Sequence, residues 1–362
     1  MYAIQRFIKE NKNWKEILQR PPYSLKINEK DDLVIFKYSQ LNSDFSIPLV
    51  CEARGIILEK KTWRCVCKGF NKFFNYGEPY AADIDWNSAY ITQKIDGSLI
   101  KVFYYNNEWR VATNGNIDAK LSSTGVGSYP TYYDLFMVAI KKYSKNFEDF
   151  TSSFKKECSY LFELISPYNR VVIPYKEFDI YFLSEINNET GSENNNCEYV
   201  KANIPIHYSF KSLEEIIEAS QKLPWDEEGY VVLDKNYHRI KVKSPEYVMA
   251  HYVRNNNVVT DKRLIQIIRD GEEDEFLTYG NEYRERLESL KKKMIEKVGV
   301  AEKLREDLNK FREGARADYA KEVQKKPNIY RGYLYKCYDS PQSFLQFSEQ
   351  WSNEKWESFL NS

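Results

Sequence analysis

The chain contains 362 residues, of which 42% are hydrophobic and 29% charged, and its formal net charge is zero. A zero net charge argues against a surface that binds polyanions over its whole area, so any basic binding surface must be local. The length predicts two domains that each bury a core. The N-terminus has no apolar leader and no stretch reaches the length of a membrane span. We therefore expect no membrane association and a location in the cytoplasm of a bacterial or infected host cell.

The first 115 residues begin with a helical pattern and continue with strands. Apolar residues at helical spacing in residues 1–20 end at Pro21-Pro22, which predicts a helix over this range. Apolar runs separated by turn residues follow this helix. They predict antiparallel strands at 33–38, 55–59, 63–67, 99–105 and 109–113.

The next segment mixes helices and strands. Residues 131–157 and 212–222 have helical patterns. Further strands are predicted at the apolar runs 158–165, 170–175, 179–184, 229–233 and 238–243. This mixed pattern predicts an α+β domain built on antiparallel sheets.

The composition changes after about residue 254. Residues 261–269 and 282–325 are rich in Lys, Glu, Arg, Leu and Ala at helical spacing, with few strand signals. We therefore predict an antiparallel-sheet domain at 1–253 and a smaller all-helical domain at 254–362. Residues 281–330 contain fourteen Lys or Arg and ten Asp or Glu. This excess fits either a solvated helix surface with i,i+4 ion pairs or a face that binds a nucleic-acid backbone.

The segment Lys94-Ile-Asp-Gly-Ser carries the strongest chemical signal in the chain. It places an amine two residues before a carboxylate and a tight turn, which suits attack by Lys94 on the α-phosphate of a nucleotide to form a phosphoramidate. A free lysine, with a pKa near 10.4, needs cations or a metal nearby to expose its lone pair. Asp-Gly is also the ordinary signature of a hairpin turn, so the motif needs support from the rest of the chain.

Two glutamates follow Lys94 at strand positions. Glu163 is a polar acid inside an apolar run, and Glu228 opens Glu-Gly-Tyr-Val-Val. Together with Asp96, these carboxylates are suited to hold ribose hydroxyls or magnesium, directly or through water. An outward-facing residue on a solvated strand would give the same local pattern as Glu163.

A basic strand comes last in this series. Arg239, Lys241 and Lys243 alternate with apolar residues, so a strand places the three cations on one face. We expect Lys241 and Lys243 to neutralise a triphosphate and to lower the pKa of Lys94 by like-charge repulsion. A solvated edge strand has the same alternation. This segment therefore indicates a phosphate-binding site only in combination with the other segments.

Taken in order, these segments resemble the motifs of the ATP-dependent RNA ligase 1 family of tailed bacteriophages, within the covalent nucleotidyltransferase superfamily. The resemblance implies that Lys94 becomes the AMP-lysine. It implies that the segments around Glu163 and Glu228 are the family's acidic motifs, and that Lys241-Val-Lys-Ser is its last motif, in which Lys241 and Lys243 contact phosphates. The catalytic and ATP-binding residues therefore include these five side chains.

The resemblance adds further residues upstream and downstream. Arg54 lies in Cys-Glu-Ala-Arg-Gly and Lys72 in Phe-Asn-Lys-Phe-Phe-Asn, which are similar to the family's arginine and lysine motifs and imply contacts with ATP. Tyr38 resembles another nucleotide contact. Tyr247 matches a tyrosine that the family needs for ligation, which implies a catalytic role.

The resemblance extends to a metal-binding turn, and the chain departs from the family pattern at one lysine position. Ile267-Ile-Arg-Asp-Gly-Glu-Glu-Asp resembles the family's metal-binding turn, with one residue inserted, and implies that Asp274 binds magnesium. Asp96 is the second metal candidate. Where the family places a lysine before a glycine after the strand that follows the nucleophile, this chain has Asn114. A neutral Asn114 cannot supply the same charge, so one phosphate or substrate contact must differ.

The resemblance implies an enzyme, an RNA ligase that uses ATP and Mg²⁺, with Mn²⁺ as an alternative metal. Its implied partners are RNA 3′-hydroxyl and 5′-phosphate ends, broken tRNA among them, so RNA repair is the expected role. The helical domain would help to choose tRNA, and the protein would be a monomer. Two alternatives stay open at this point. One is a DNA ligase or capping enzyme of the same superfamily, and the other is a non-catalytic RNA-binding protein on a degenerate nucleotidyltransferase scaffold.

Overall fold

The computed structural model describes residues 1–252 and 259–362, and the chain forms two compact units, Met1–His251 and Tyr252–Ser362. The domain boundary predicted between residues 253 and 254 lies outside the described residues. Among the helices of the described ranges, none is both long and apolar enough to cross a membrane.

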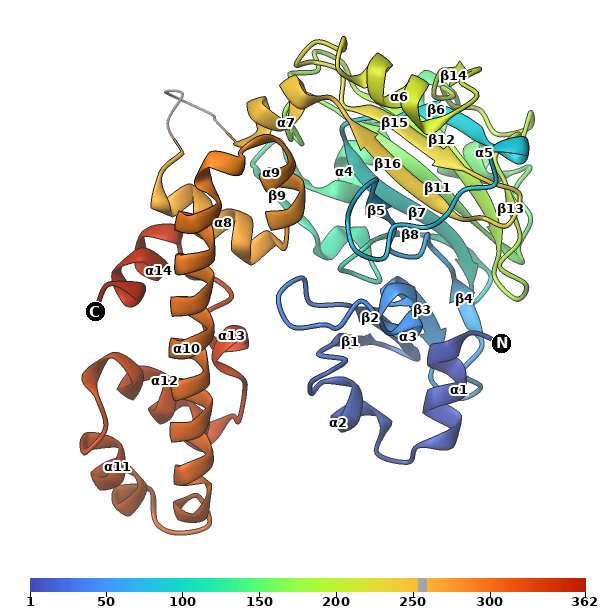
Figure 1. The fold of residues 1–362 in the computed structure, drawn as a ribbon. Coiled ribbons are helices and arrows are strands. Elements are labelled where there is room, and N and C mark those ends of the chain that lie inside the picture. The colour runs from blue at the N-terminus through green and yellow to red at the C-terminus, as the bar shows by residue number, and fades with distance from the viewer. Residues whose placement is uncertain (253–258) are drawn as a thin grey trace. The chain divides into compact units, whose positions relative to one another are not determined.

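The first unit begins with short helices that pack on a four-stranded antiparallel sheet in the order β1-β2-β3-β4 (Figure 1). The helix predicted over residues 1–20 is in fact two helices, because the chain turns at 11–13. The helices are α1 (Ala3–Glu10), α2 (Trp14–Leu18) and α3 (Pro48–Glu52). The strands are β1 (Lys26–Lys30), β2 (Leu33–Lys37), β3 (Arg54–Glu59) and β4 (Cys65–Cys67).

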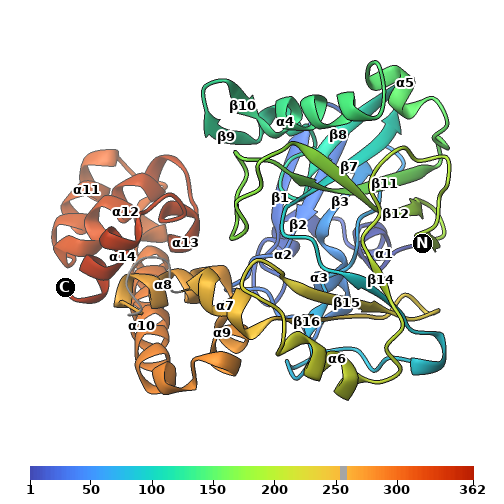
Figure 2. The same cartoon turned by 90° about the horizontal axis from the view of Figure 1, so that it is seen from above.

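Two five-stranded sheets form the rest of the first unit and face one another (Figure 2). The first sheet is antiparallel throughout and has the order β13-β12-β11-β7-β8. Its strands are β7 (Ser98–Tyr105), β8 (Glu108–Thr113), β11 (Cys158–Ile165), β12 (Asp179–Asn187) and β13 (Glu193–Asn194).

The second sheet has the order β14-β6-β15-β16-β5, and its β16–β5 pair is parallel while the other pairs are antiparallel. Its strands are β5 (Phe74–Asn75), β6 (Tyr90–Gln93), β14 (His207–Tyr208), β15 (Gly229–Leu233) and β16 (Arg239–Lys243). A separate two-stranded sheet pairs β9 (Ser123–Val126) with β10 (Tyr129–Thr131).

Helices cover the outer faces of the two large sheets (Figure 2). α4 (Tyr132–Ala139) and α5 (Phe147–Thr151) pack on the first sheet through a largely aromatic core, and α6 (Leu213–Ser220) packs on the second. Because strand residues alternate between faces, the residues between the core positions of each strand point into the space between the sheets. This arrangement positions the candidate site.

The strand predicted at residues 170–175 is wrong. These residues form an irregular segment between β11 and β12. The backbone N–H groups of Val172 and Ile173 donate to the carboxylate of Asp96 instead of to a neighbouring strand. The helix predicted over 131–157 is also interrupted, because α4 ends at Ala139 and passes through the 3₁₀ turn η3 (Ile140–Lys142) before α5 begins. The other predicted strands are confirmed to within a few residues.

The second unit is helical over its described residues, as the sequence predicts. The long helix α10 (Arg284–Leu308) packs against α8, α12, α13 and α14. The helices are α8 (Asp261–Asp270), α9 (Glu273–Tyr279), α10, α11 (Arg316–Gln324), α12 (Asn328–Asp339), α13 (Phe344–Phe347) and α14 (Asn353–Leu360), with 3₁₀ turns η4 (Asn281–Tyr283) and η5 (Asn309–Phe311). The α+β class with a helical C-terminal part is therefore confirmed.

Candidate active site

A pocket of about 340 Å³ lies between the inner faces of the two five-stranded sheets. Strands of both sheets line it, and three of the predicted site residues belong to its wall: Arg54, Lys94 and Glu163. Asn114, the position where the family pattern is broken, lies in the same wall. The fold thus brings together residues that are up to about 110 positions apart in the sequence.

Lys94 is held at the end of β6 by two contacts with the start of β15. Its backbone N–H donates to the carbonyl of Gly229 at 2.8 Å, and its Nζ lies 2.7 Å from Oε1 of Glu228. Nζ of Lys243 lies 3.3 Å from the same oxygen. The Glu228 carboxylate, only 5% exposed, therefore sits between two ammonium groups. It orients the Lys94 ammonium, which must lose a proton before it attacks.

Gly229 makes this arrangement sterically possible. Its φ angle is +129°, a backbone conformation that residues with a Cβ rarely adopt. A Cβ at this position would also collide with the carbonyl oxygen of Val242 on the paired strand β16. The glycine thus allows the close approach of β15 and β16 that places Glu228 beside Lys243.

Asp96 is a buried hydrogen-bond acceptor between two residues of the pocket wall, Ile95 and Gly97. One carboxylate oxygen accepts from the N–H groups of Val172 and Ile173 at 2.9 and 2.7 Å. The other accepts from the hydroxyl of Tyr247 at 2.9 Å. Asp96 is 3% exposed and Tyr247 is 2% exposed. These contacts give both residues a role in positioning the segment that follows Lys94. The metal role of Asp96 and the ligation role of Tyr247 stay predictions.

Glu163 faces the pocket from β11. The alternate residues Phe162 and Leu164 pack under the helices of the outer face, so Glu163 points between the sheets. Burial raises the pKa of the Glu163 carboxyl to about 8, the Lys94 ammonium acts in the opposite direction, and Glu228 raises it further. A neutral Glu163 carboxyl at pH 7 is therefore ready to ionise when a cation comes close.

We expect the stability of the protein to fall as the pH rises from about 5 to about 8, and we expect Glu163→Gln to remove this part of the pH dependence. In the unfolded chain the carboxyl ionises near its ordinary pKa of 4.5, whereas the folded protein retains the proton up to about 8. The unfolded state therefore binds fewer protons in this window, and the free energy of unfolding decreases by roughly 3 kcal/mol.

Urea unfolding at about pH 5 and about pH 8.5 measures this difference. Glu157→Gln is the matched control, because Glu157 is an exposed glutamate directly before β11. Parallel stability profiles for the wild type and Glu163→Gln would contradict the raised pKa.

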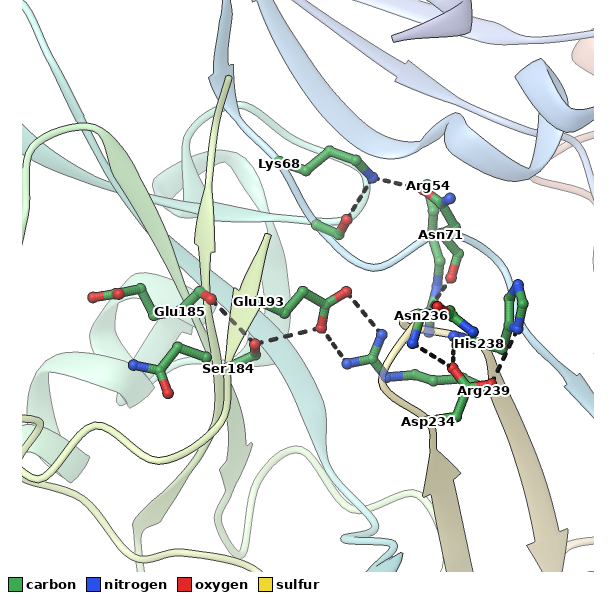
Figure 3. A network of polar contacts seen from close by, with 12 residues as sticks. Arg54, Lys68, Asn71, Ser184, Glu185, Glu193, Asp234, Asn236, His238 and Arg239 are labelled. Carbon is green, nitrogen blue, oxygen red and sulfur yellow. Dashed lines mark hydrogen bonds and ion pairs between the residues drawn. The ribbon is translucent and has the colours of Figure 1, made fainter. Parts of the chain in front are cut away.

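The basic strand β16 turns its cations toward the other sheet, because Ile240 and Val242 pack in the core with α6. Arg239 on this strand is engaged in an ion pair. Its guanidinium forms a two-pronged ion pair with the Glu193 carboxylate from β13, with Nη1 2.9 Å from Oε1 (Figure 3). It also lies 4.2 Å from the centre of the Phe70 ring. Arg239 thus ties the two sheets together.

The upstream residue Lys72 lines a neighbouring pocket of about 660 Å³, which shares Phe73 and Arg239 with the first pocket. Nζ of Lys72 lies 5.3 Å from the centre of the Tyr38 ring. Arg54 connects the two regions, because its guanidinium lies 5.0 Å from the Phe73 ring and donates to the carbonyl of Asn71 (Figure 3).

The metal prediction divides between the two units. Asp274 is an exposed residue of α9 in the second unit, whereas Asp96 lies in the first. Within residues 1–252 and 259–362, no group of three or more His, Cys, Asp or Glu side chains forms a preformed metal cluster. Mg²⁺ is usually held by one or two carboxylates together with substrate phosphates and water. Glu163, which lines the pocket, and Glu228, which contacts Lys94, fit this donor set.

The sequence gives no sign of two residues near the site whose side chains are largely covered. Glu193, with a side chain 9% exposed, lies in an Asn-rich stretch that is typical of a surface loop. Lys101 is fully buried in a strand among apolar neighbours. Lys101 stands at a position that strand alternation turns toward the core. A charged residue at such a position is the one signal that the sequence offers.

A family model described as RNA ligase matches residues 52–247, which contain the pocket. A bifunctional polynucleotide kinase/RNA ligase of Autographa californica nuclear polyhedrosis virus is 31% identical over 76% of this chain and 41% of that protein. This chain therefore spans about two fifths of the length of that relative. The RNA ligase of Rhodothermus phage RM378 is 25% identical over 68% of this chain and 70% of its own length.

Among solved structures, an archaeal ATP-dependent RNA ligase has a similar arrangement with a TM-score of 0.46. The two chains are 10% identical, and the match covers 80% of this chain and 78% of the archaeal one.

Proposed function

Since the chain belongs to the RNA ligase family, we propose that it is an ATP-dependent ligase that joins an RNA 3′-hydroxyl to an RNA 5′-phosphate through an AMP-lysine at Lys94. The observation that carries the proposal is the position of the Lys94 amine in a pocket between two sheets, beside Glu228 and Lys243 and in one wall with Arg54 and Glu163. In this arrangement, an amine nucleophile is surrounded by acidic and basic side chains that can accept its proton and balance phosphate charge.

The first step is attack by the Lys94 amine on the α-phosphorus of ATP. A nitrogen–phosphorus bond forms, the bond from the α-phosphorus to the bridging oxygen breaks, and pyrophosphate leaves. The Lys94 ammonium must first give up one proton, for which Oε1 of Glu228 at 2.7 Å is a nearby acceptor. The cations Arg54, Lys241 and Lys243 are suited to balance the phosphate charges.

The next two steps transfer AMP to the RNA. The 5′-phosphate of one strand takes AMP from Lys94, and the 3′-hydroxyl of the other strand then displaces AMP as the phosphodiester forms. When bound, Mg²⁺ or Mn²⁺ shields the phosphate charges, and Glu163 and Glu228 would hold it. Broken tRNA as substrate, a monomeric state and a cytoplasmic location stay predictions, as do the roles of Asp274 and the helical unit.

Incubation with ATP labelled at the α-phosphate tests the proposal. We expect a covalent label on the wild-type protein that survives alkali but is released by hot acid, as a phosphoramidate is, that requires a divalent metal, and that is not formed from labelled GTP. A chase with RNA bearing a 5′-phosphate and a 3′-hydroxyl should release the label as AMP and seal the RNA. A wild-type protein that takes no label would sink the ligase proposal and favour a binding protein on the same scaffold.

Substrate panels separate the remaining alternatives. Nicked tRNA, single-stranded RNA, a nicked RNA duplex and the matching DNA substrates are compared at equal concentration of ends. Sealing of the DNA ends alone would indicate a DNA ligase. Transfer of GMP in place of AMP would indicate a capping enzyme.

A further inference from the structure

Lys101 is a fully buried lysine in the middle of β7. Its side chain is 0% exposed, and its ammonium donates to the carbonyl of Gly55. In the described part of the chain, no carboxylate lies within ion-pairing distance of Lys101. Burial lowers the pKa of this ammonium, and the positive charge of Arg54 acts in the same direction. Because an unpaired buried cation destabilises a fold, its presence calls for an explanation in function.

The backbone at Gly55 brings Lys101 close to Asn114. A Cβ added to Gly55, whose φ angle is +81°, would stand 2.6 Å from Nζ of Lys101, 2.8 Å from the carbonyl oxygen of Asn114 and 3.0 Å from its Cα. Lys101 and the segment that leads to Asn114 also lie on paired strands, since Lys101 is opposite Ala112. The ammonium of Lys101 is therefore within reach of the Asn114 side chain.

The Asn114 side chain lacks the hydrogen-bond donor that Lys101 could supply. Its Oδ1 is buried and accepts no hydrogen bond from the described residues, while the residue lines the pocket that contains Lys94 and Arg54. An unpaired buried acceptor costs about 1–3 kcal/mol. The Lys101 ammonium has three N–H donors, and one of them is used by Gly55. A donor with spare hydrogens and an acceptor without a partner thus belong to two residues that both adjoin Gly55.

We propose that Lys101, Asn114 and Arg54 form a phosphate-binding subsite, in which Lys101 donates to Oδ1 of Asn114 and the Asn114 amide N–H and the Arg54 guanidinium bind phosphate oxygens. The buried charge polarises the amide and makes its N–H groups stronger donors. A phosphate in front of Arg54 and Asn114 also offsets the two neighbouring positive charges. The chain therefore supplies from β7 a charge that the sequence pattern lacks at position 114. The subsite rests on the proposed use of ATP.

The test compares ATP with adenosine, which lacks phosphates. Calorimetry measures both ligands with proteins that carry Lys94→Ala, so that no covalent step interferes. We expect Lys101→Met to weaken ATP binding roughly tenfold and to leave adenosine binding unchanged, while the thermal midpoint stays level or rises because a buried charge is lost. Lys156→Met is the matched control for charge removal, because Lys156 is exposed and its ammonium lies over the Tyr104 ring. It should change neither affinity.

A second variant tests the charge itself. Adding Asn114→Lys to Lys101→Met moves the cation to the pocket wall and should restore most of the ATP affinity. Unchanged ATP affinity in Lys101→Met, an equal loss for ATP and adenosine, or no recovery in the double variant would each overturn the subsite. These outcomes are distinct from failure of the ligase proposal, because wild-type labelling with AMP reports that separately.

Discussion

Lys94→Ala should abolish covalent labelling by AMP, with a loss on the order of 10⁴-fold or more in the rate of adduct formation. The reason is that Lys94 is the proposed nucleophile, and its Nζ lies in the pocket beside Glu228. Lys94→Arg should fail equally, because a guanidinium keeps the charge but has no free lone pair near neutral pH. Gel autoradiography after incubation with labelled ATP measures the adduct.

A supplied RNA adenylate separates loss of the nucleophile from loss of the fold. RNA that already carries AMP on its 5′-phosphate bypasses the first two steps, so Lys94→Ala should still seal it. Lys156→Met serves again as the control lysine and should label as the wild type does. Persistent labelling of Lys94→Ala would move the nucleophile to another lysine, with Lys241 and Lys243 as the first positions to map.

Asp96→Ala should lower the free energy of unfolding by about 3–5 kcal/mol. The substitution removes a buried carboxylate that accepts from the N–H groups of Val172 and Ile173 and from the hydroxyl of Tyr247. Two backbone donors and one phenol would then be left without this acceptor in an interior site. Urea unfolding followed by circular dichroism measures the loss.

Tyr247→Phe is the graded companion of Asp96→Ala. It removes one of the three hydrogen bonds and leaves the carboxylate in place, so a smaller loss of roughly 2 kcal/mol is expected. A fully stable Asp96→Ala whose labelling needs much more magnesium would contradict the positioning role. It would support the predicted metal role of Asp96 instead.

Strand alternation explains why much of the site could be predicted from the sequence. On β11 and β16, residues with period two separate the core side from the pocket side. Lys241 and Lys243 could therefore be assigned to one face of their strand without coordinates, and Glu163 could be singled out as an acid inside an apolar run. The order of the motifs then predicts Lys94 as the nucleophile. These signals are local, and each extends over a few residues of one strand.

The failures concern contacts that are distant in the sequence. The apolar run at 170–175 has the composition of a strand, but its N–H groups are satisfied by the side chain of Asp96. The sequence pattern assigns Arg239 only to the same strand face as Lys241 and Lys243, and it contains no sign that Glu193 from another sheet neutralises it. No local pattern contains either partner, because each pair is set by how two sheets come together.

The division of the site between two sheets has a consequence for its dynamics. Lys94 and Glu228 belong to one hydrogen-bonded ladder and Glu163 to another. Fraying of the β6–β15 pair would therefore disconnect the nucleophile while the β7–β11–β12 ladder stays intact. Amide hydrogen exchange should report two protection classes in the pocket wall, and bound nucleotide should raise the weaker class toward the stronger. Catalytic competence would then be lost at a lower free energy than global unfolding.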